Sequence, residues 1–140
     1  MRRRAAVAAA VLLLPCAGFA DPHVDYMLQC QGCHLPDGGE TPGAVPALKG
    51  FVAKFLWVEG GREFLVRVPG SSQSSLDDAR LAAVLNWILV TFDPEHLPTD
   101  FDSFTAEEVA TLRRPPLMDV ASVRAALVAA IESAANGSPR

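Results

Sequence analysis

The chain has 140 residues, half of them hydrophobic, with 12 basic and 16 acidic side chains and a formal net charge of −4. Proteins that bind nucleic acid usually carry a basic footprint, so the acidic balance argues against a nucleic-acid partner. The length suits one domain with a modest hydrophobic core, and neither an internal repeat nor a long block of like charge interrupts the sequence.

Residues 1–20 have the pattern of a secretory signal peptide: three arginines, an apolar run and small residues that end at Ala20. The apolar run is about half of the roughly 20 residues that a membrane-spanning helix needs, so we expect no span in the mature chain. A lipid anchor on Cys16 is disfavoured because Pro15 stands where a small residue is wanted. Cleavage near Ala20 leaves 9 basic and 16 acidic residues, a formal charge of −7. We therefore expect an exported, periplasmic protein.

The first predicted helix covers residues 22–31, and Asp21 can cap its start. Apolar and long side chains recur at helical spacing, namely Val24, Met27, Leu28 and Gln31. We expect this stripe to face the core.

Cys30 and Cys33 remain after such cleavage, and several uses of the pair compete. An exported setting favours a disulfide, but a bond between residues three apart closes a very small loop and stabilises little. A redox-active pair belongs near a βαβ pattern, and nothing before Cys30 has the pattern of a strand. A structural zinc site needs four ligands, and only His23, His34 and His96 could join the two sulfurs.

A covalently attached haem uses every residue of the motif CQGCH, residues 30–34. On a helical turn the sulfurs of Cys30 and Cys33 project from one side, where each can add to a vinyl group of the porphyrin. His34 then places its imidazole beneath the iron. We therefore predict one covalently attached haem c, bound through Cys30 and Cys33, with His34 as the ligand of the iron.

The motif CQGCH and the segment VPALKG, residues 45–50, resemble the class I cytochrome c family, which is all-α. The resemblance implies that the Pro46 carbonyl accepts a hydrogen bond from His34, that Leu48 packs on the haem and that Gly50 permits a close turn. A ligating histidine usually donates its second N–H to a fixed acceptor, which sets its tautomer. Without the resemblance, Pro46 is an ordinary turn residue.

The segment between the motif and the longest helix is less regular. Residues 35–43 are rich in glycine and proline and predict a loop under the haem. Residues 51–58 predict a short helix with Phe51, Phe55 and Val58 on one face, although a strand stays open for so short an apolar run. Residues 62–68 continue with a weak helical preference.

The clearest predicted helix covers residues 74–92, with Ser75 and Asp78 in a capping-box pattern. Its apolar stripe consists of Leu81, Val84, Leu85 and Ile88. The helix resembles the family's C-terminal helix, which crosses the first helix, and Trp87 stands where an aromatic residue commonly marks that crossing. We interpret Trp87 as a core residue rather than an electron relay.

Residues 94–140 predict a helical extension to a haem domain of residues 21–93. Thr105 can cap one helix of the extension and Asp119 can cap a second. The apolar face of the second helix consists of Val120, Val123, Leu127 and Ile131. We expect this face to pack on the core, with docking to a redox partner as the alternative. We expect His23 and His96 to face solvent.

The family pattern breaks before the longest helix. Many class I cytochromes have a methionine followed by proline there, and its sulfur is the second axial ligand, but this chain has Val68 and Pro69. Met118 could reach the iron only if the extension folds across the haem, and is otherwise a gap-filling side chain in a helix contact. Met27 is expected on the proximal side or in a helix contact. An open sixth position is the remaining alternative.

The resemblance implies a non-enzymatic, exported monohaem cytochrome that carries single electrons from an exported dehydrogenase or reductase to a downstream acceptor. The alternative function is a haem-based binder or sensor of small ligands that uses an open sixth position. A peroxidase-like enzyme ranks last, because the sequence offers no acid–base group that is well placed for it. The acidic balance predicts electrostatic docking that weakens with salt.

Overall fold

The computed structural model describes residues 21–43 and 45–137, so the predicted signal peptide lies outside the described residues. The elements are, in chain order, α1 (Pro22–Gln29), α2 (Gln31–His34), the 3₁₀-helix η1 (Val52–Trp57), α3 (Gly61–Arg67), α4 (Pro69–Ser72), α5 (Asp78–Phe92), the 3₁₀-helix η2 (Pro94–His96), α6 (Ala106–Leu112) and α7 (Val120–Gly137). Within the described residues, one isolated bridge between Thr41 and Val45 is the only β-type pairing. The all-α prediction is confirmed.

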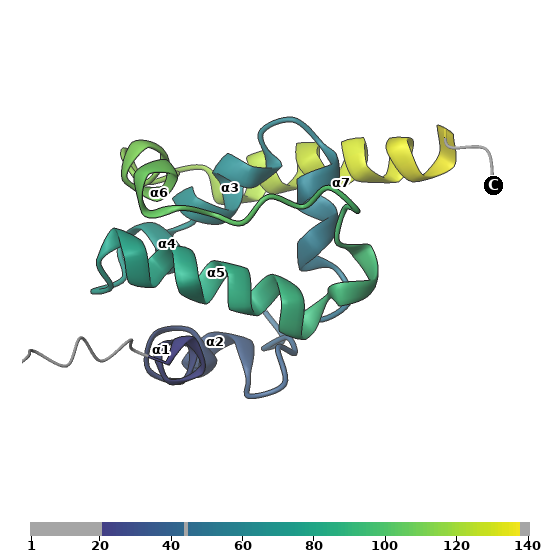
Figure 1. The fold of residues 1–140 in the computed structure, drawn as a ribbon. Coiled ribbons are helices and arrows are strands. Elements are labelled where there is room, and N and C mark those ends of the chain that lie inside the picture. The colour runs from purple at the N-terminus through teal and green to yellow at the C-terminus, as the bar shows by residue number, and fades with distance from the viewer. Residues whose placement is uncertain (1–20, 44, 138–140) are drawn as a thin grey trace, which may run out of the picture.

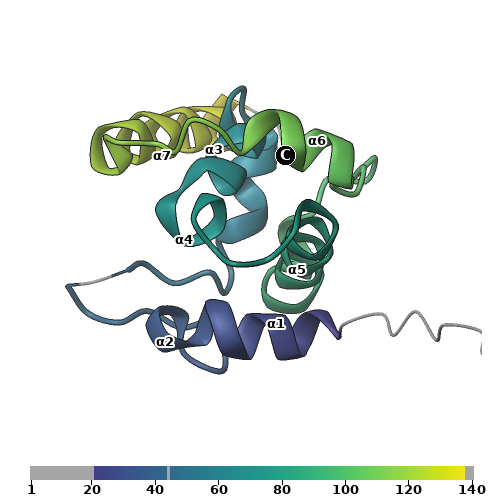
Figure 2. The same cartoon turned by 90° about the vertical axis from the view of Figure 1, so that its left-hand side faces the viewer.

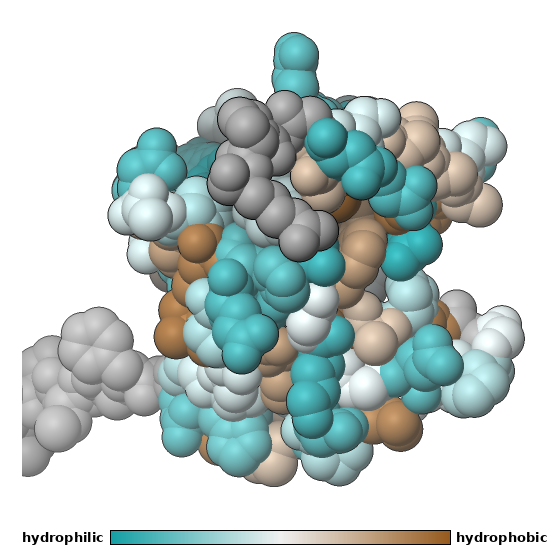
Figure 3. All heavy atoms as spheres, turned by 90° about the vertical axis from the view of Figure 1, so that its right-hand side faces the viewer, coloured by the Kyte–Doolittle hydropathy of each residue, from teal (hydrophilic) through white to brown (hydrophobic). Residues whose placement is uncertain are grey.

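The helices surround the long central helix α5 (Figure 1). Helix α1 packs against one side of α5, α6 packs against another, and α7 lies against η1 and α3. Figure 2 shows α1 and α2 at one side of the molecule and α7 at the other, with α3 beside α7 and α4 between the two sides. On the face drawn in Figure 3, hydrophilic residues are interspersed with smaller apolar areas. No helix in the described part of the chain is both long and apolar enough to span a membrane.

The contact between α1 and α5 is aromatic, as the position of Trp87 predicts. The Trp87 ring stacks on His23 with centroids 5.1 Å apart and lies 5.2 Å from the Tyr26 ring. An ion pair between Asp25 of α1 and Arg80 of α5 joins the same two helices. The two helices are therefore joined both by ring packing and by a buried carboxylate.

The predicted inner face of α1 is wrong. Tyr26 and Asp25 are buried, whereas Val24, Met27 and Leu28 are exposed, Leu28 to 70%. On the buried face, the ring of Tyr26 packs against Trp87, which the aliphatic side chains of the predicted stripe could not do as an aromatic pair. Asp25 gains a cationic partner, Arg80, on the same face. Helical spacing alone finds a stripe but does not say which face meets the aromatic partners.

The start of α5 also differs from the prediction. Asp77, rather than Ser75, is the cap, and its carboxylate accepts a hydrogen bond of 2.8 Å from the backbone N–H of Arg80. A capping side chain must stand directly before the first helical residue, and α5 begins at Asp78, so Ser75 lies too far upstream. The predicted stripe is confirmed, since Leu81, Val84, Leu85 and Ile88 are all buried.

The segment after the loop is helical, as favoured, but in the tighter 3₁₀ form of η1. It meets α3 so closely that a Cβ atom on Gly61 would lie 1.8 Å from the Phe55 carbonyl oxygen. Only glycine fits there. The chain can therefore turn directly from η1 into α3.

The C-terminal residues pack on the core, as expected. Thr105 caps α6 by accepting a hydrogen bond of 3.2 Å from Glu108 N–H, and the carboxylate of Glu108 pairs with Arg62 of α3 at 2.6 Å. Leu127 and Ile131 of α7 are buried. Asp119 accepts a hydrogen bond from Ser122 N–H at the start of α7, as its capping role predicts.

Beyond α6, Arg113 is buried and donates to the backbone carbonyls of Ser72, Ser74 and Leu76. These carbonyls belong to α4 and to the turn that leads into α5. One guanidinium therefore fastens the extension to the end of α4 and the turn after it.

His96 was expected to face solvent, but its side chain is only 29% exposed and pairs with a buried carboxylate. Its Nδ1 lies 2.5 Å from the carboxylate of Asp93, which is 1% exposed, and its carbonyl accepts a hydrogen bond from the Trp57 indole. The Asp93 carboxylate also accepts a hydrogen bond of 2.8 Å from Ala53 N–H, which ties the end of α5 to η1.

We predict that Asp93→Ala lowers the free energy of unfolding by about 1–3 kcal/mol, because it leaves the buried Ala53 N–H without an acceptor. Denaturant unfolding followed by circular dichroism measures the change. Asp100→Ala, at an exposed aspartate, is the matched control and should leave the midpoint unchanged. Equal effects of the two substitutions would contradict the prediction.

Candidate functional site

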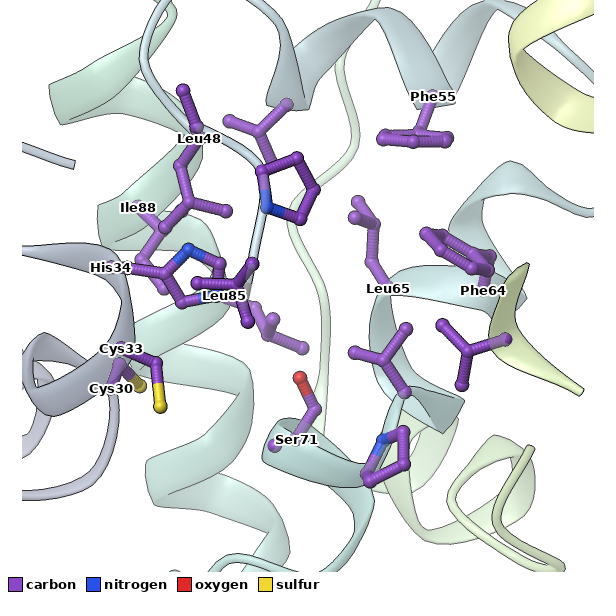
Figure 4. A pocket seen from close by; sticks show the side chains of 18 of the residues that line it. Cys30, Cys33, His34, Leu48, Phe55, Phe64, Leu65, Ser71, Leu85 and Ile88 are labelled. Carbon is purple, nitrogen blue, oxygen red and sulfur yellow. The ribbon is translucent and has the colours of Figure 1, made fainter. Parts of the chain in front are cut away.

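A largely apolar cavity of about 430 Å³ lies between α2, the loop that follows it, α3, α5 and the start of α7. Its size is within the range of small-molecule and cofactor sites. Figure 4 shows Cys30, Cys33 and His34 on one side of this space and Phe55, Phe64 and Leu65 on the other. The cavity thus has one wall that bears sulfur and nitrogen and one wall of hydrocarbon.

The two cysteines and the histidine reach the cavity because the chain turns tightly there. Cys33 N–H and His34 N–H both donate to the Cys30 carbonyl, at 3.1 and 3.0 Å. Both thiols are free and both line the cavity. Burial raises the pKa of the Cys30 thiol to about 11, helped by the charges of Asp25 and Cys33. Such a thiol stays protonated near neutral pH, unlike the thiolates of redox-active pairs.

The His34 imidazole stands beside the sulfurs and lines the cavity. Burial lowers its pKa, while the backbone carbonyl of Pro46 acts in the opposite direction. The neutral imidazole, which is the metal-binding form, is therefore favoured. Its Nδ1 atom is buried and makes no hydrogen bond, although the Pro46 carbonyl is near enough to act on the ring. The hydrogen bond from His34 to Pro46 that the resemblance implies is therefore not formed in this structure.

The segment that carries Pro46 and Leu48 also lines the cavity. It is held by backbone bonds from Leu48 N–H to the Gly38 carbonyl at 2.8 Å and from Gly50 N–H to the Phe92 carbonyl at 2.9 Å. Gly50 has a φ of 69°, the left-handed conformation that a close turn requires. The structure therefore brings Cys30, Cys33, His34, Pro46 and Leu48 around one space.

Tyr26 holds the backbone at the end of the haem motif by hydrogen bonds, a role that the sequence did not reveal. Its hydroxyl donates to the Leu35 carbonyl at 2.6 Å and lies 3.3 Å from the His34 carbonyl. Leu35 has φ 58° and ψ 162°, a region that is almost restricted to glycine, so the neighbouring contacts must hold it there. The available signal was a tyrosine one helical turn before Cys30.

The opposite wall carries no sulfur or imidazole among the described residues. It is formed by Phe55, Phe64, Leu65, Val68 and Ser71. Met118 is 91% exposed and does not line the cavity, so it is neither near this wall nor the gap-filling side chain that was expected. Met27, on α1, is 43% exposed and does not line the cavity either. The methionines of the described chain therefore stand outside the cavity.

These residues fit a flat, mostly apolar group that contains a metal. The cavity offers two free thiols for attachment, a neutral imidazole as a nitrogen donor and hydrocarbon surfaces on the remaining sides. The buried Nδ1 atom of His34 has an acceptor, the Pro46 carbonyl, close to it. Cysteine thiols form the thioether tethers of a c-type haem, and an imidazole is a usual ligand of its iron.

The comparisons with known proteins agree with this chemistry. No protein-family model matches the chain. The chain is 40% identical over 107 residues to cytochrome c-552 of Thermus thermophilus, a match that covers 64% of this chain and 82% of that protein. A second cytochrome c-552, from a named strain of the same species, matches with the same identity over the same length and is covered to 72%.

Three findings point to one family. The fold is all-α, the cavity suits a tethered metal group, and the sequence is 40% identical to two cytochromes c over most of their length. The chain belongs to the class I monohaem c-type cytochromes, electron-transfer proteins rather than enzymes, which carry one covalently bound haem c with its iron.

Proposed function

We propose that the chain is an exported electron carrier whose haem c is held at the cavity by thioether bonds to Cys30 and Cys33, with His34 as an axial ligand of the iron. The observation that carries the proposal is the convergence of these three side chains on one wall of an apolar cavity. The haem supplies a one-electron couple at the iron, and the protein sets where and in which surroundings that couple stands.

The neighbours of His34 support its role. A ligating histidine usually donates its other ring N–H to a fixed acceptor, which sets its tautomer and raises its basicity. The Pro46 carbonyl, which lies near the His34 ring and acts to raise its pKa, would be this acceptor, and Tyr26 fixes the backbone of His34 and Leu35. Leu48, on the same loop as Pro46, would cover the ring.

The place of action and the partners follow from the sequence. A signal peptide that ends at Ala20 would export the protein to the periplasm and leave a formal charge of −7. A dehydrogenase or reductase in the same compartment, with a basic or mixed surface, would suit this charge. We further propose a haem unit of residues 21–93 and an extension of residues 94–140, which adds Val120 and Arg124 to the cavity wall.

One observation favours a second candidate function, the binding of small ligands at the sixth position of the iron. Among the described residues that line the cavity, none besides His34 and the two cysteines carries a sulfur or an imidazole, and Met118 is exposed to 91%. The opposite wall offers hydrocarbon and the hydroxyl of Ser71. Such a wall suits a neutral diatomic molecule, and the polarity of a distal pocket decides between ligand binding and electron transfer.

The attachment sites are tested by substitution. We predict that Cys30→Ser with Cys33→Ser abolishes covalent haem in a host that matures c-type cytochromes, because both thiols that can form thioethers are lost. Haem staining on a denaturing gel measures the attachment. Gln31→Ala, inside the same motif, is the control and should keep the stain. Covalent haem in the double serine variant would contradict the assignment.

The sixth position is tested with carbon monoxide. We predict that the visible spectrum of the reduced protein shifts on adding carbon monoxide, because the cavity wall opposite His34 consists of side chains that bind iron weakly or not at all. Met118→Ala should give the same spectra as the natural chain, since Met118 lies outside the cavity. A spectrum that stays unchanged in the natural chain would show a strong sixth ligand and exclude the second candidate.

The proposed electrostatic attraction of redox partners is tested with two small redox reagents of opposite charge. We predict that the rate of electron transfer to hexaammineruthenium, a cation, falls by about tenfold or more as the salt concentration rises, because screening removes its attraction to the acidic protein. Ferricyanide, an anion, is the matched control, and its rate should rise. Rates that ignore salt with both reagents would argue against electrostatic docking.

A further inference from the structure

Arg124 stands in the apolar face of α7. Besides the predicted apolar residues of this face, Arg124 stands directly after Val123, four residues after Val120 and three before Leu127. Leu127 and Ile131 are buried, and Val120 lines the cavity. An arginine in the middle of such a stripe brings a permanent charge to the side of the helix that faces the core.

The cavity that Arg124 borders is largely apolar. Arg124 lines the same cavity as Cys30 and His34, and no aspartate or glutamate among the described residues lines that cavity. Its guanidinium carbon lies 5.7 Å from the centroid of the Phe51 ring, a favourable but weak cation–π contact. Arg124 is thus the one permanently charged side chain in the described cavity wall.

The other arginines in the described chain show what is missing at this position. Arg62, Arg67, Arg80 and Arg113 each lie within 4.0 Å of a carboxylate. Within residues 21–43 and 45–137, Arg114 and Arg124 make no such pair, but Arg114 is exposed and Arg124 is half-buried. A charge that is partly removed from water needs an opposite charge beside it.

The haem supplies carboxylates on the correct edge. A porphyrin of this type carries its two vinyl groups on one edge and its two propionates on the opposite edge. Cys30 and Cys33 lie at the α2 side of the cavity, and Arg124 reaches the cavity from α7, on the opposite side of the molecule (Figure 2). A ring that is joined to the cysteines by its vinyl edge therefore directs its carboxylates away from α2, toward the region where Arg124 stands.

We propose that Arg124 is a carboxylate-binding residue, that it pairs with a haem propionate, and that it thereby fastens α7 over the loaded cavity. This inference rests on the proposed function, because it requires the haem to be attached at Cys30 and Cys33. A guanidinium suits the role, since its planar fork can donate two parallel hydrogen bonds to one carboxylate. The extension then contributes to the haem site itself, beyond its packing on the core.

The pairing affects the iron as well as the helix. A propionate whose charge is balanced by Arg124 contributes little to the potential at the iron, whereas an unbalanced carboxylate favours the ferric form. Removing the charge should therefore lower the reduction potential and raise the pH at which the potential responds to protonation of the propionate. It should also loosen α7, because Arg124 would no longer join that helix to the group in the cavity.

The experiment compares holoproteins that carry Arg124→Gln, Arg124→Met or Arg124→Lys. We expect a lower potential and a higher transition pH in both neutral variants, and near-natural values in the lysine variant, which keeps the charge. Hydrogen exchange of residues 120–137 should be faster in both neutral variants. Arg114→Gln is the matched control, because it removes an exposed arginine outside the cavity and should change neither quantity.

The two levels of the proposal fail in different ways. Absence of covalent haem from the natural chain would overturn the proposed function itself. Covalent haem in every variant, with potentials and pH profiles equal to those of Arg114→Gln, would overturn the role of Arg124 alone. Should Arg124→Gln yield no holoprotein, Arg124→Met, which keeps a long apolar stem on the helix, decides the question by the same two measurements.

Discussion

The packing of α1 against α5 is the interaction on which the site depends. Tyr26 is the central side chain, since its ring contacts Trp87 and Phe92 while its hydroxyl holds the Leu35 carbonyl. Leu35 is the residue directly after His34. The side chain that joins the two helices therefore also fixes the backbone of the haem motif. The buried Asp25 carboxylate, from the residue before Tyr26, and its partner Arg80 hold the same contact. Any movement of α1 on α5 would therefore move both thiols and the imidazole.

The second constraint is the tight closure of the cavity by short irregular segments. Gly61 allows α3 to begin directly against η1, and this brings Phe64 and Leu65 opposite the motif (Figure 4). Hydrogen bonds from the loop to Gly38 and Phe92 carry Pro46 and Leu48 to the edge of the same space. The walls are therefore positioned by backbone contacts, and their side chains are free to be apolar, which suits a porphyrin and keeps water from its iron.

The C-terminal extension, residues 94–140, is joined to the rest of the fold by direct contacts. Arg113 joins α6 to the end of α4 and the turn before α5, Glu108 joins it to α3, and the apolar face of α7 covers η1. An electron carrier needs surroundings that change little between its two oxidation states, and these contacts hold the helices of the extension against the rest of the fold. The proposed contact of Arg124 with the haem would make the position of α7 depend on the group in the cavity.

The sequence by itself determined the chemistry and the helical class. Cys30, Cys33 and His34 are adjacent in the chain, so their joint use depends on local geometry, and the stripe of α5 and the cap of α6 likewise need only near neighbours. Only the tertiary structure decided the buried face of α1, the pairing of His96 with Asp93, the exposure of Met118 and the entry of Arg124 into the cavity. The buried face of α1, the exposure of Met118 and the entry of Arg124 depend on residues far apart in the chain, and the Asp93 carboxylate that pairs with His96 is itself held by Ala53, 40 residues away. Periodicity carries no information about which partner lies across such a contact.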